Sequence, residues 1–197
     1  MRNARCRLPV VLLLATVAGC ANLRAPQTAG NVPDPAVVTE WTAKGRIGFS
    51  AQGEGGSGSF VWRQVASRTE LELRGPLGAG GFDLTTDGSQ LQLRDASGNA
   101  LDDEAARAEL ERRLGGTLPL AQLRYWSLGV PAPPGSAPGD GPVQAATGAA
   151  PGFVQDGWVV TLDQSRAVGG WRLPVRLSAT TSGVRIRLVI DDWQVQP

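Results

Sequence analysis

The stretch that decides the fold is residues 60–95, which read FVWRQVASRTELELRGPLGAGGFDLTTDGSQLQLRD. Apolar and polar residues alternate over 70–74, 82–84 and 91–94, and a period of two is typical of strands that bury one face. Between two of these segments, Asp87-Gly88 is a strong hairpin signal. Short alternating segments joined by tight turns predict antiparallel strands that pair in sequence order.

The same pattern returns near the C-terminus, so the sheet is built from both halves of the chain. The later alternating segments are 158–162, 175–179 and 184–195. In a chain of 197 residues, 42% apolar residues suffice for one domain with a core, and 26 Gly and 14 Pro favour many turns. We therefore predict a mainly β protein of about eight or more antiparallel strands in a curved sheet or an open barrel.

A helical insert separates the two β segments. Acidic residues begin the stretch 102–114 and basic residues end it, as the helix dipole favours, and Gly115-Gly116 follows. Pro119 suits the first turn of a second helix that ends before Gly129. We expect this insert, about 102–129, to cover the concave face of the sheet. A flexible loop is predicted over 131–152, because 17 of its 22 residues are Pro, Gly or Ala.

The N-terminus has the pattern of a lipoprotein signal peptide. Three arginines among the first seven residues precede an apolar run over 10–18 that is too short to cross a bilayer as a helix. The run ends in Val17-Ala18-Gly19-Cys20, which resembles the lipobox of bacterial lipoproteins. We expect a signal peptide over 1–19, lipidation at Cys20 and a polar tether over 20–40. The alternative is a simple secretory signal with an incidental cysteine.

The composition argues against most kinds of catalysis and against nucleic-acid binding. The chain has no His, which removes Ser-His-Asp catalysis, Cys-His catalysis and His-ligated zinc, and its net charge of +1 is too balanced for nucleic acid.

Residues 53–58 match G-x-G-x-x-G, but a strand pattern follows where a nucleotide-binding helix would begin, which favours a hairpin. Acids at 102–104 are typical of a first helical turn rather than of a metal site. Asp191-Asp192 is expected to break the last strand with a bulge. We expect no enzyme activity, no cofactor and no metal.

Two features of the sequence are unusual for a protein whose apolar residues only fill a core. The first is the set of six tryptophans, which either fill the interior or line an apolar cavity, since a curved sheet of this size can enclose more space than its side chains fill. The second is Gly75-Pro76-Leu77-Gly78, a turn sequence with one large apolar residue. Leu77 either tucks back against its own strands or is presented to a membrane or partner.

Several short motifs follow one another in a specific order. They are Lys44-Gly45-Arg46-Ile47 after Trp41, Phe60-Val61-Trp62-Arg63-Gln64, Gly75-Pro76-Leu77-Gly78, Leu118-Pro119-Leu120, Leu123-Arg124-Tyr125-Trp126, Phe153-Val154-Gln155-Asp156-Gly157-Trp158, Leu173-Pro174, and Arg187-Leu188-Val189-Ile190 before Trp193. Together with the lipobox, this order resembles the LolB family of outer-membrane lipoproteins over essentially the whole chain after Cys20. The short tether and the Gly/Pro-rich stretch 131–152 depart from the family pattern.

The resemblance implies a fold and a function. The implied fold is an unclosed antiparallel β-barrel with a helical lid covering an apolar cavity, in one domain over 41–197. The implied function is a receptor that accepts acylated lipoproteins from the periplasmic carrier LolA and inserts them into the outer membrane. Leu77 falls at the family's protruding-loop leucine, which implies a membrane insertion loop of Gly75, Pro76, Leu77 and Gly78. Ala21, in place of Asp after the lipidated Cys, favours the outer membrane by the same resemblance.

The acyl-binding cavity would be lined by inward-facing apolar residues of the sheet and of the second helix. We expect these to be Ile47, Phe49, Trp62, Leu71, Leu73, Leu123, Trp126 and Trp158. The expected partners are LolA, triacylated lipoprotein cargo and outer-membrane phospholipid, with the receptor a monomer at the periplasmic face of the outer membrane. A generic lipid-binding protein and a structural outer-membrane lipoprotein remain as alternatives, and the latter predicts a filled interior.

Overall fold

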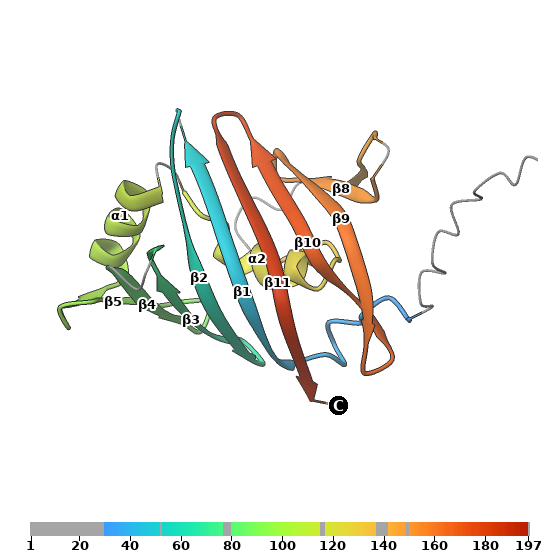
Figure 1. Ribbon diagram of the computed structural model, residues 1–197, viewed down its shortest axis with the longest axis horizontal. Helices are drawn as coiled ribbons and strands as arrows, with labels where there is room; N and C mark the ends of the chain where they lie inside the picture. Colours follow the sequence, from blue (N-terminus) through green and yellow to red (C-terminus); the bar gives the residue numbers. More distant parts are fainter. Residues whose placement is uncertain are drawn as a thin grey trace, which may run out of the picture.

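One curved antiparallel sheet dominates the structure (Figure 1). The computed structural model describes residues 30–51, 53–76, 80–114, 117–136, 142–148 and 150–196. In these residues eleven strands pair in the order β6-β5-β4-β3-β2-β1-β11-β10-β9-β8-β7. The outer strands β6 and β7 do not pair with each other, so the barrel is unclosed. The predicted mainly β, open antiparallel fold is confirmed.

The elements are β1 (Glu40–Ala51), β2 (Glu54–Val65), β3 (Arg68–Arg74), β4 (Gly81–Thr86), β5 (Leu91–Asp95), β6 (Ala100–Asp102), α1 (Asp103–Leu114), α2 (Leu120–Ser127), β7 (Gln144–Ala145), β8 (Gly152–Gln155), β9 (Trp158–Val168), β10 (Trp171–Thr181) and β11 (Val184–Gln196).

Alternating burial explains why the quoted stretch forms strands. In β3, Thr69, Leu71 and Leu73 are buried, while the residues between them face outward. The β4–β5 hairpin turns at Asp87-Gly88, where Gly88 has a φ of 99° that favours glycine. Residues 54–58 lie in β2, so the G-x-G-x-x-G match belongs to a hairpin, as predicted.

The first and last strands lie side by side at the centre of the sheet. β1 pairs with β11 from Glu40↔Gln196 to Ala51↔Val184. The register shifts by one residue beside Lys44, where Asp191 is the extra residue of a β-bulge. The predicted bulge is confirmed, but the predicted break is wrong: β11 continues through it because Ile190 and Trp193 on either side remain buried.

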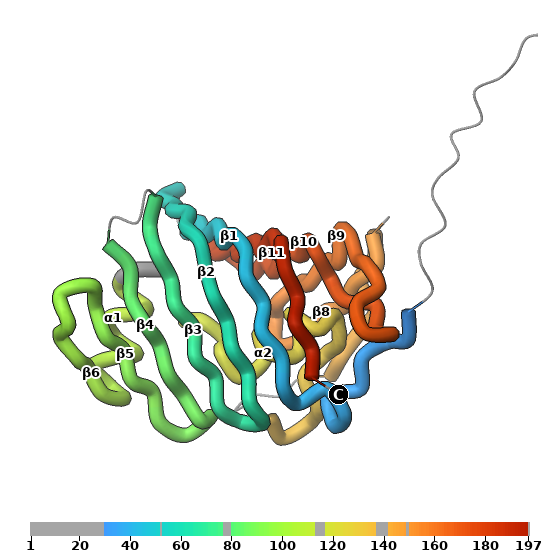
Figure 2. Tube along the Cα trace, turned by 60° about the horizontal axis from the view of Figure 1, so that its bottom comes forward, coloured from blue at the N-terminus to red at the C-terminus, as the bar shows by residue number. Residues whose placement is uncertain are grey.

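The two helices occupy different parts of the sheet. α1 packs beside β5 and β6 and buries Ala106 and Leu110. α2 lies inside the curve of the sheet (Figure 2), begins after Pro119 and is followed by Gly129 with a φ of 84°. Its buried residues include Leu123 and Trp126. The structure thus places α2 on the concave face, while its role as a lid stays a prediction. No helix in the described part of the chain is long and apolar enough to cross a membrane.

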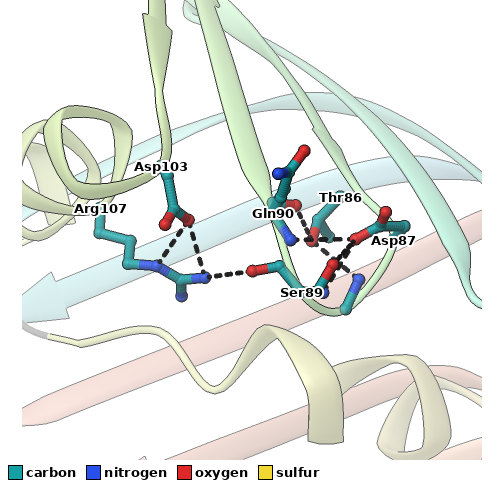
Figure 3. A network of polar contacts seen from close by, with 7 residues as sticks. Thr86, Asp87, Ser89, Gln90, Asp103 and Arg107 are labelled. Atoms are coloured by element: carbon teal, nitrogen blue, oxygen red, sulfur yellow. Dashed lines mark hydrogen bonds and ion pairs between the residues drawn. The ribbon is translucent and has the colours of Figure 1, made fainter.

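A polar network fastens α1 to the β4–β5 turn (Figure 3). The Asp87 carboxylate accepts hydrogen bonds from the backbone N–H groups of Gln90 at 3.0 Å and Ser89 at 2.9 Å. These bonds favour the charged form and lower the pKa of Asp87 to about 2. Arg107 of α1 donates to the Ser89 carbonyl at 3.5 Å and to Asp103 at 3.2 Å.

Part of the segment predicted as a tether is hydrogen-bonded to the sheet. The Asn31 backbone donates to the Gly170 carbonyl at 3.0 Å and accepts from the Arg172 N–H at 2.8 Å. The apolar side chain of Val38 is buried, which holds the chain against the domain before β1 begins. Residues 20–29 of the predicted tether, Cys20 included, lie outside the described residues.

Candidate functional site

The inner face of the sheet encloses an apolar cavity of about 300 Å³. Its walls come from β1, β2, β3, β4 and β11, and Leu118 and Leu123 close it from the helical insert. Aromatic and aliphatic side chains form most of the lining, and Arg74 is the one charged residue among the described residues that line it. A volume of this size is at the lower end of the range of small-molecule pockets. The interior is therefore not completely filled.

Six of the eight residues predicted for the cavity lie in its lining. They are Ile47, Phe49, Trp62, Leu71, Leu73 and Leu123. Those from strands alternate on the inner face, which is why the period-two pattern places them together. Their role in binding acyl chains stays a prediction.

The other two predicted residues, Trp126 and Trp158, lie outside this lining. Their ring centroids are 6.0 Å apart, and Trp126 also packs edge-on against Phe153 at 6.5 Å. Trp126 is fully buried, so the three rings pack α2 against β8 and β9. Leu123 and Trp126 thus have separate places: Leu123 contributes to the cavity and Trp126 to the helix–sheet contact.

Gln155 anchors α2, and the sequence analysis assigned it no role. Its Oε1 accepts hydrogen bonds from Trp126 Nε1 and from the Ala132 N–H, and its Nε2 donates to the Ala132 carbonyl, each at 2.9 Å. The side chain is 1% exposed, so these bonds satisfy it in a dry environment. The signal in the sequence was a polar residue two positions after Phe153, on the buried face of the strand.

Tryptophans fill the part of the interior around the start of β1. Trp41 lies 5.3 Å from both Trp62 and Trp193, measured between ring centroids. The Trp193 indole donates to the Pro174 carbonyl at 2.7 Å. Trp62 belongs to this cluster and to the cavity lining at once. Among the described tryptophans, Trp62 alone lines this cavity, and it also packs in the cluster, whereas Trp41 and Trp193 fill the interior.

Glycines leave room at one end of the cavity. Gly56 lies opposite Phe49, and a Cβ there would come within 2.6 Å of the Phe49 ring. A Cβ on Gly58 would lie 2.2 Å from the Arg74 carbonyl oxygen. Side chains at these two positions would fill the space between β1, β2 and the end of β3. This part of the cavity exists because Gly56 and Gly58 leave two successive inner-face positions of β2 without side chains.

The predicted insertion loop begins beside the glycine-rich end of the cavity. Gly75 lines the cavity and Pro76 is exposed, while Leu77 and Gly78 lie outside the described residues. Arg74, at the base of the loop, donates to the Leu73 carbonyl at 2.9 Å and bonds the Asp83 carboxylate of β4. This pairing raises the pKa of Arg74 and joins the two strands that carry the loop.

A known protein family matches most of the chain, and curated relatives match nearly all of it. The family described as "Outer membrane lipoprotein LolB" matches residues 39–193. The chain is 30% identical to the outer-membrane lipoprotein LolB of Pseudomonas fluorescens (strain Pf-5), over 93% of each chain. It is equally similar to proteins of the same name from Pseudomonas savastanoi pv. phaseolicola, over 94% of each chain, and Pseudomonas putida (strain GB-1), over 92%.

Proposed function

This chain belongs to the LolB family of outer-membrane lipoproteins, and on that basis we propose that it is the receptor that accepts acylated lipoproteins from the periplasmic carrier LolA and inserts them into the outer membrane. Membership implies a role in lipoprotein localisation rather than catalysis. The observation that carries the proposal is the apolar cavity beside α2, because acyl chains are the cargo groups that need such a space.

Such a receptor lowers the free-energy cost of exposing acyl chains to water. A triacylated lipoprotein carries three chains of roughly fifteen methylenes, and each buried methylene is worth about 0.8 kcal/mol. Leaving the membrane for water therefore costs on the order of 30 kcal/mol. A receptor cavity removes part of this penalty during transfer, and a descending order of free energy from carrier to receptor to bilayer gives transfer its direction.

The size of the cavity bears on how much of the cargo fits. At about 300 Å³ it is at the lower end of small-molecule pockets, which is a space for part of one acyl chain rather than for three. Binding of a single chain inside the sheet, with α2 as the covering element over Leu123, is the arrangement that these dimensions support.

A fluorescent acyl probe tests this use of the cavity. We expect the full chain carrying Cys20→Ser, which prevents lipidation, to bind the probe saturably at one per chain. Ile47→Trp fills the cavity from its partly exposed wall and should weaken binding at least tenfold. Val159→Trp makes the same kind of change on the outer face of β9, where Val159 is exposed, and should leave binding unchanged. Absence of saturable binding would contradict the proposal.

Leu77 is the residue proposed to enter the inner leaflet of the outer membrane and ease the release of cargo. The support is the family resemblance at Gly75-Pro76-Leu77-Gly78 and the position of Gly75 beside the cavity. Leu77→Glu should slow cargo insertion while acyl-probe binding persists, and Leu77→Met should retain both. Normal insertion by Leu77→Glu would refute this role.

Lipidation of Cys20 after removal of residues 1–19 would hold the receptor at its target membrane. Mass spectrometry of the protein from membranes should show an N-terminal Cys20 with attached acyl chains. An unmodified N-terminus would instead favour a soluble lipid-binding protein. A stable crosslinked complex in a variant that binds no acyl probe would favour the structural lipoprotein.

A further inference from the structure

Four exposed arginines gather on the outer face of β1, β10 and β11, opposite the cavity; this face is turned toward the reader in Figure 1. Arg46 and Arg176 are the register partners of Val189 on its two sides. Arg187 and Arg185 follow on the same face of β11. Neighbouring strands lie about 4.8 Å apart, and each residue advances a strand by about 3.4 Å, so the four Cα atoms fit within roughly 10 by 14 Å. We call this set the arginine patch.

Positive charge on the arginine patch has little local compensation. Arg46 pairs with Asp191 at 3.1 Å, and both side chains are more than half exposed. Within the ranges that the structure describes, Arg176, Arg185 and Arg187 have no carboxylate within 4.0 Å. The register partners of Arg187 are Gly48 and Ser178, and those of Arg185 are Ser50 and Thr180. The acids at its margin on this face are Asp191 and Asp192, at the bulge in β11.

The arginine patch lies at the same end of the sheet as the loop that follows Arg74. Arg74 is the register partner of Ser59, and Ser59 is the partner of Arg46. One row of residues thus runs from the base of the loop across β2 and β1 into the patch. Arg187 and Arg185 lie beyond this row, toward the β10–β11 turn at Gly183. Anything that contacts the base of the loop at Arg74 is therefore close to the arginine patch as well.

The chemistry of the patch fits lipid headgroups better than a protein partner. Protein interfaces are organised around buried aromatic or long apolar anchors, and the neutral residues here are Gly, Ser, Thr and one Val. Attraction to an anionic leaflet needs only positive charge within about a Debye length of the surface. Arginine side chains are long enough to extend from the sheet toward phosphate groups.

We propose that Arg46, Arg176, Arg185 and Arg187 bind the phosphate groups of anionic phospholipids in the target membrane and so orient the receptor with its loop toward the bilayer. The orienting role rests on the proposed function. The binding itself does not, because it needs neither cargo nor cavity.

Vesicle partitioning tests the proposal with the full chain carrying Cys20→Ser. An arginine near an anionic leaflet strengthens binding about fivefold. In that background, Arg185→Gln/Arg187→Gln should weaken binding to phosphatidylglycerol–phosphatidylcholine vesicles about 25-fold and leave binding to pure phosphatidylcholine vesicles unchanged. Arg185→Lys/Arg187→Lys should retain most of the binding. Arg63→Gln removes a charge from the outer face of β2 outside the patch and should have less than a twofold effect.

Three results would overturn the proposal. The first is unchanged binding of the Gln double variant to phosphatidylglycerol vesicles. If that variant also loses transfer of cargo from the carrier, the patch belongs to a protein interface. The second is an equal loss with Arg63→Gln, which would indicate overall charge. The third is displacement by inorganic phosphate beyond that by chloride at equal ionic strength, which would indicate a free-anion site. Acyl-probe binding by the double variant should be normal, so this test and that of the cavity fail independently.

Discussion

Replacing Gln155 by Leu should release α2 from the sheet. The substitution keeps the size of the side chain but removes both the acceptor and the donor that serve Trp126 and Ala132. Three polar groups then lack partners: the Trp126 indole N–H, the Ala132 N–H and the Ala132 carbonyl. Trp126 is fully buried and Ala132 is 2% exposed, so water does not reach these groups without local opening.

The expected loss follows from the number of orphaned groups. A buried polar group without a partner costs about 1–3 kcal/mol, and partial relaxation of neighbouring groups reduces the sum. We expect the free energy of unfolding to fall by about 3–5 kcal/mol, a large part of the 5–15 kcal/mol typical of a domain. At about 2–4 °C per kcal/mol for a chain of this size, the Tm should fall by roughly 10 °C.

Gln64 provides a matched control. It is also a buried glutamine, accepting from Thr69 Oγ1 at 2.7 Å and donating to the Ala66 carbonyl at 2.8 Å, but its bonds lie within β2, β3 and their turn. Gln64→Leu should lower stability as well. Only Gln155→Leu should speed amide hydrogen exchange selectively across 120–132, as measured by mass spectrometry.

Two outcomes would contradict this role of Gln155. The first is a loss below about 1 kcal/mol in denaturant unfolding of Gln155→Leu, since three orphaned groups cost more than that. The second is equal exchange across 120–132 in the two variants. In a double variant with Trp126→Phe, which removes one orphaned group, the loss of stability should be smaller than the sum of the two single losses. An additive result would mean that Trp126 and Gln155 are not coupled.

Three further predictions concern the hairpins around the cavity. Gly58→Ala should lower the free energy of unfolding in urea by at least about 1–3 kcal/mol, because its Cβ would lie 2.2 Å from the Arg74 carbonyl oxygen. Gly48→Ala should cost much less, because a Cβ there would lie 4.0 Å from the Gly56 carbonyl oxygen; equal costs would contradict the close approach at Gly58. Arg74→Met should lower the free energy of unfolding by only about 0.5–1 kcal/mol, since Arg74 and Asp83 are both more than a third exposed. This loss should be smaller in high salt. A loss that does not depend on salt would mean that the Arg74–Asp83 ion pair is not its source. The pKa of Asp87, lowered to about 2 from 3.8, gives stability that is complete above pH 4 and lost as the pH falls through 2. Asp87→Asn should therefore make the Tm depend less on pH between 4 and 2. An unchanged dependence of the Tm on pH in thermal melts would refute this prediction.

Most of the sheet could be predicted because local patterns determine its strands. Leu71 and Leu73 alternate with charged residues, and Asp87-Gly88 supplies a turn that needs glycine. These signals lie within a few residues of one another. The same periodicity placed Ile47 and Phe49 on the cavity side of β1.

Features that depend on long-range contacts could not be predicted in the same way. Trp126 and Leu123 lie on one short helix and look equivalent in sequence, yet only packing against Phe153 and Trp158 separates their roles. The partners of Gln155 come from residues more than twenty positions away. The bulge at Asp191 does not end β11, because burial on both sides of it outweighs a local preference for a break.

In the proposed function, acyl chains of cargo enter the hollow inside the sheet. Photocrosslinking of a lipoprotein with a diazirine on its acyl chain, followed by mass spectrometry of the labelled peptides, measures this directly. We expect labels on inner-face residues such as Ile47, Phe49 and Leu71, and a marked loss of label in Ile47→Trp. Labels confined to the outer face, or unaffected by filling the cavity, would contradict it.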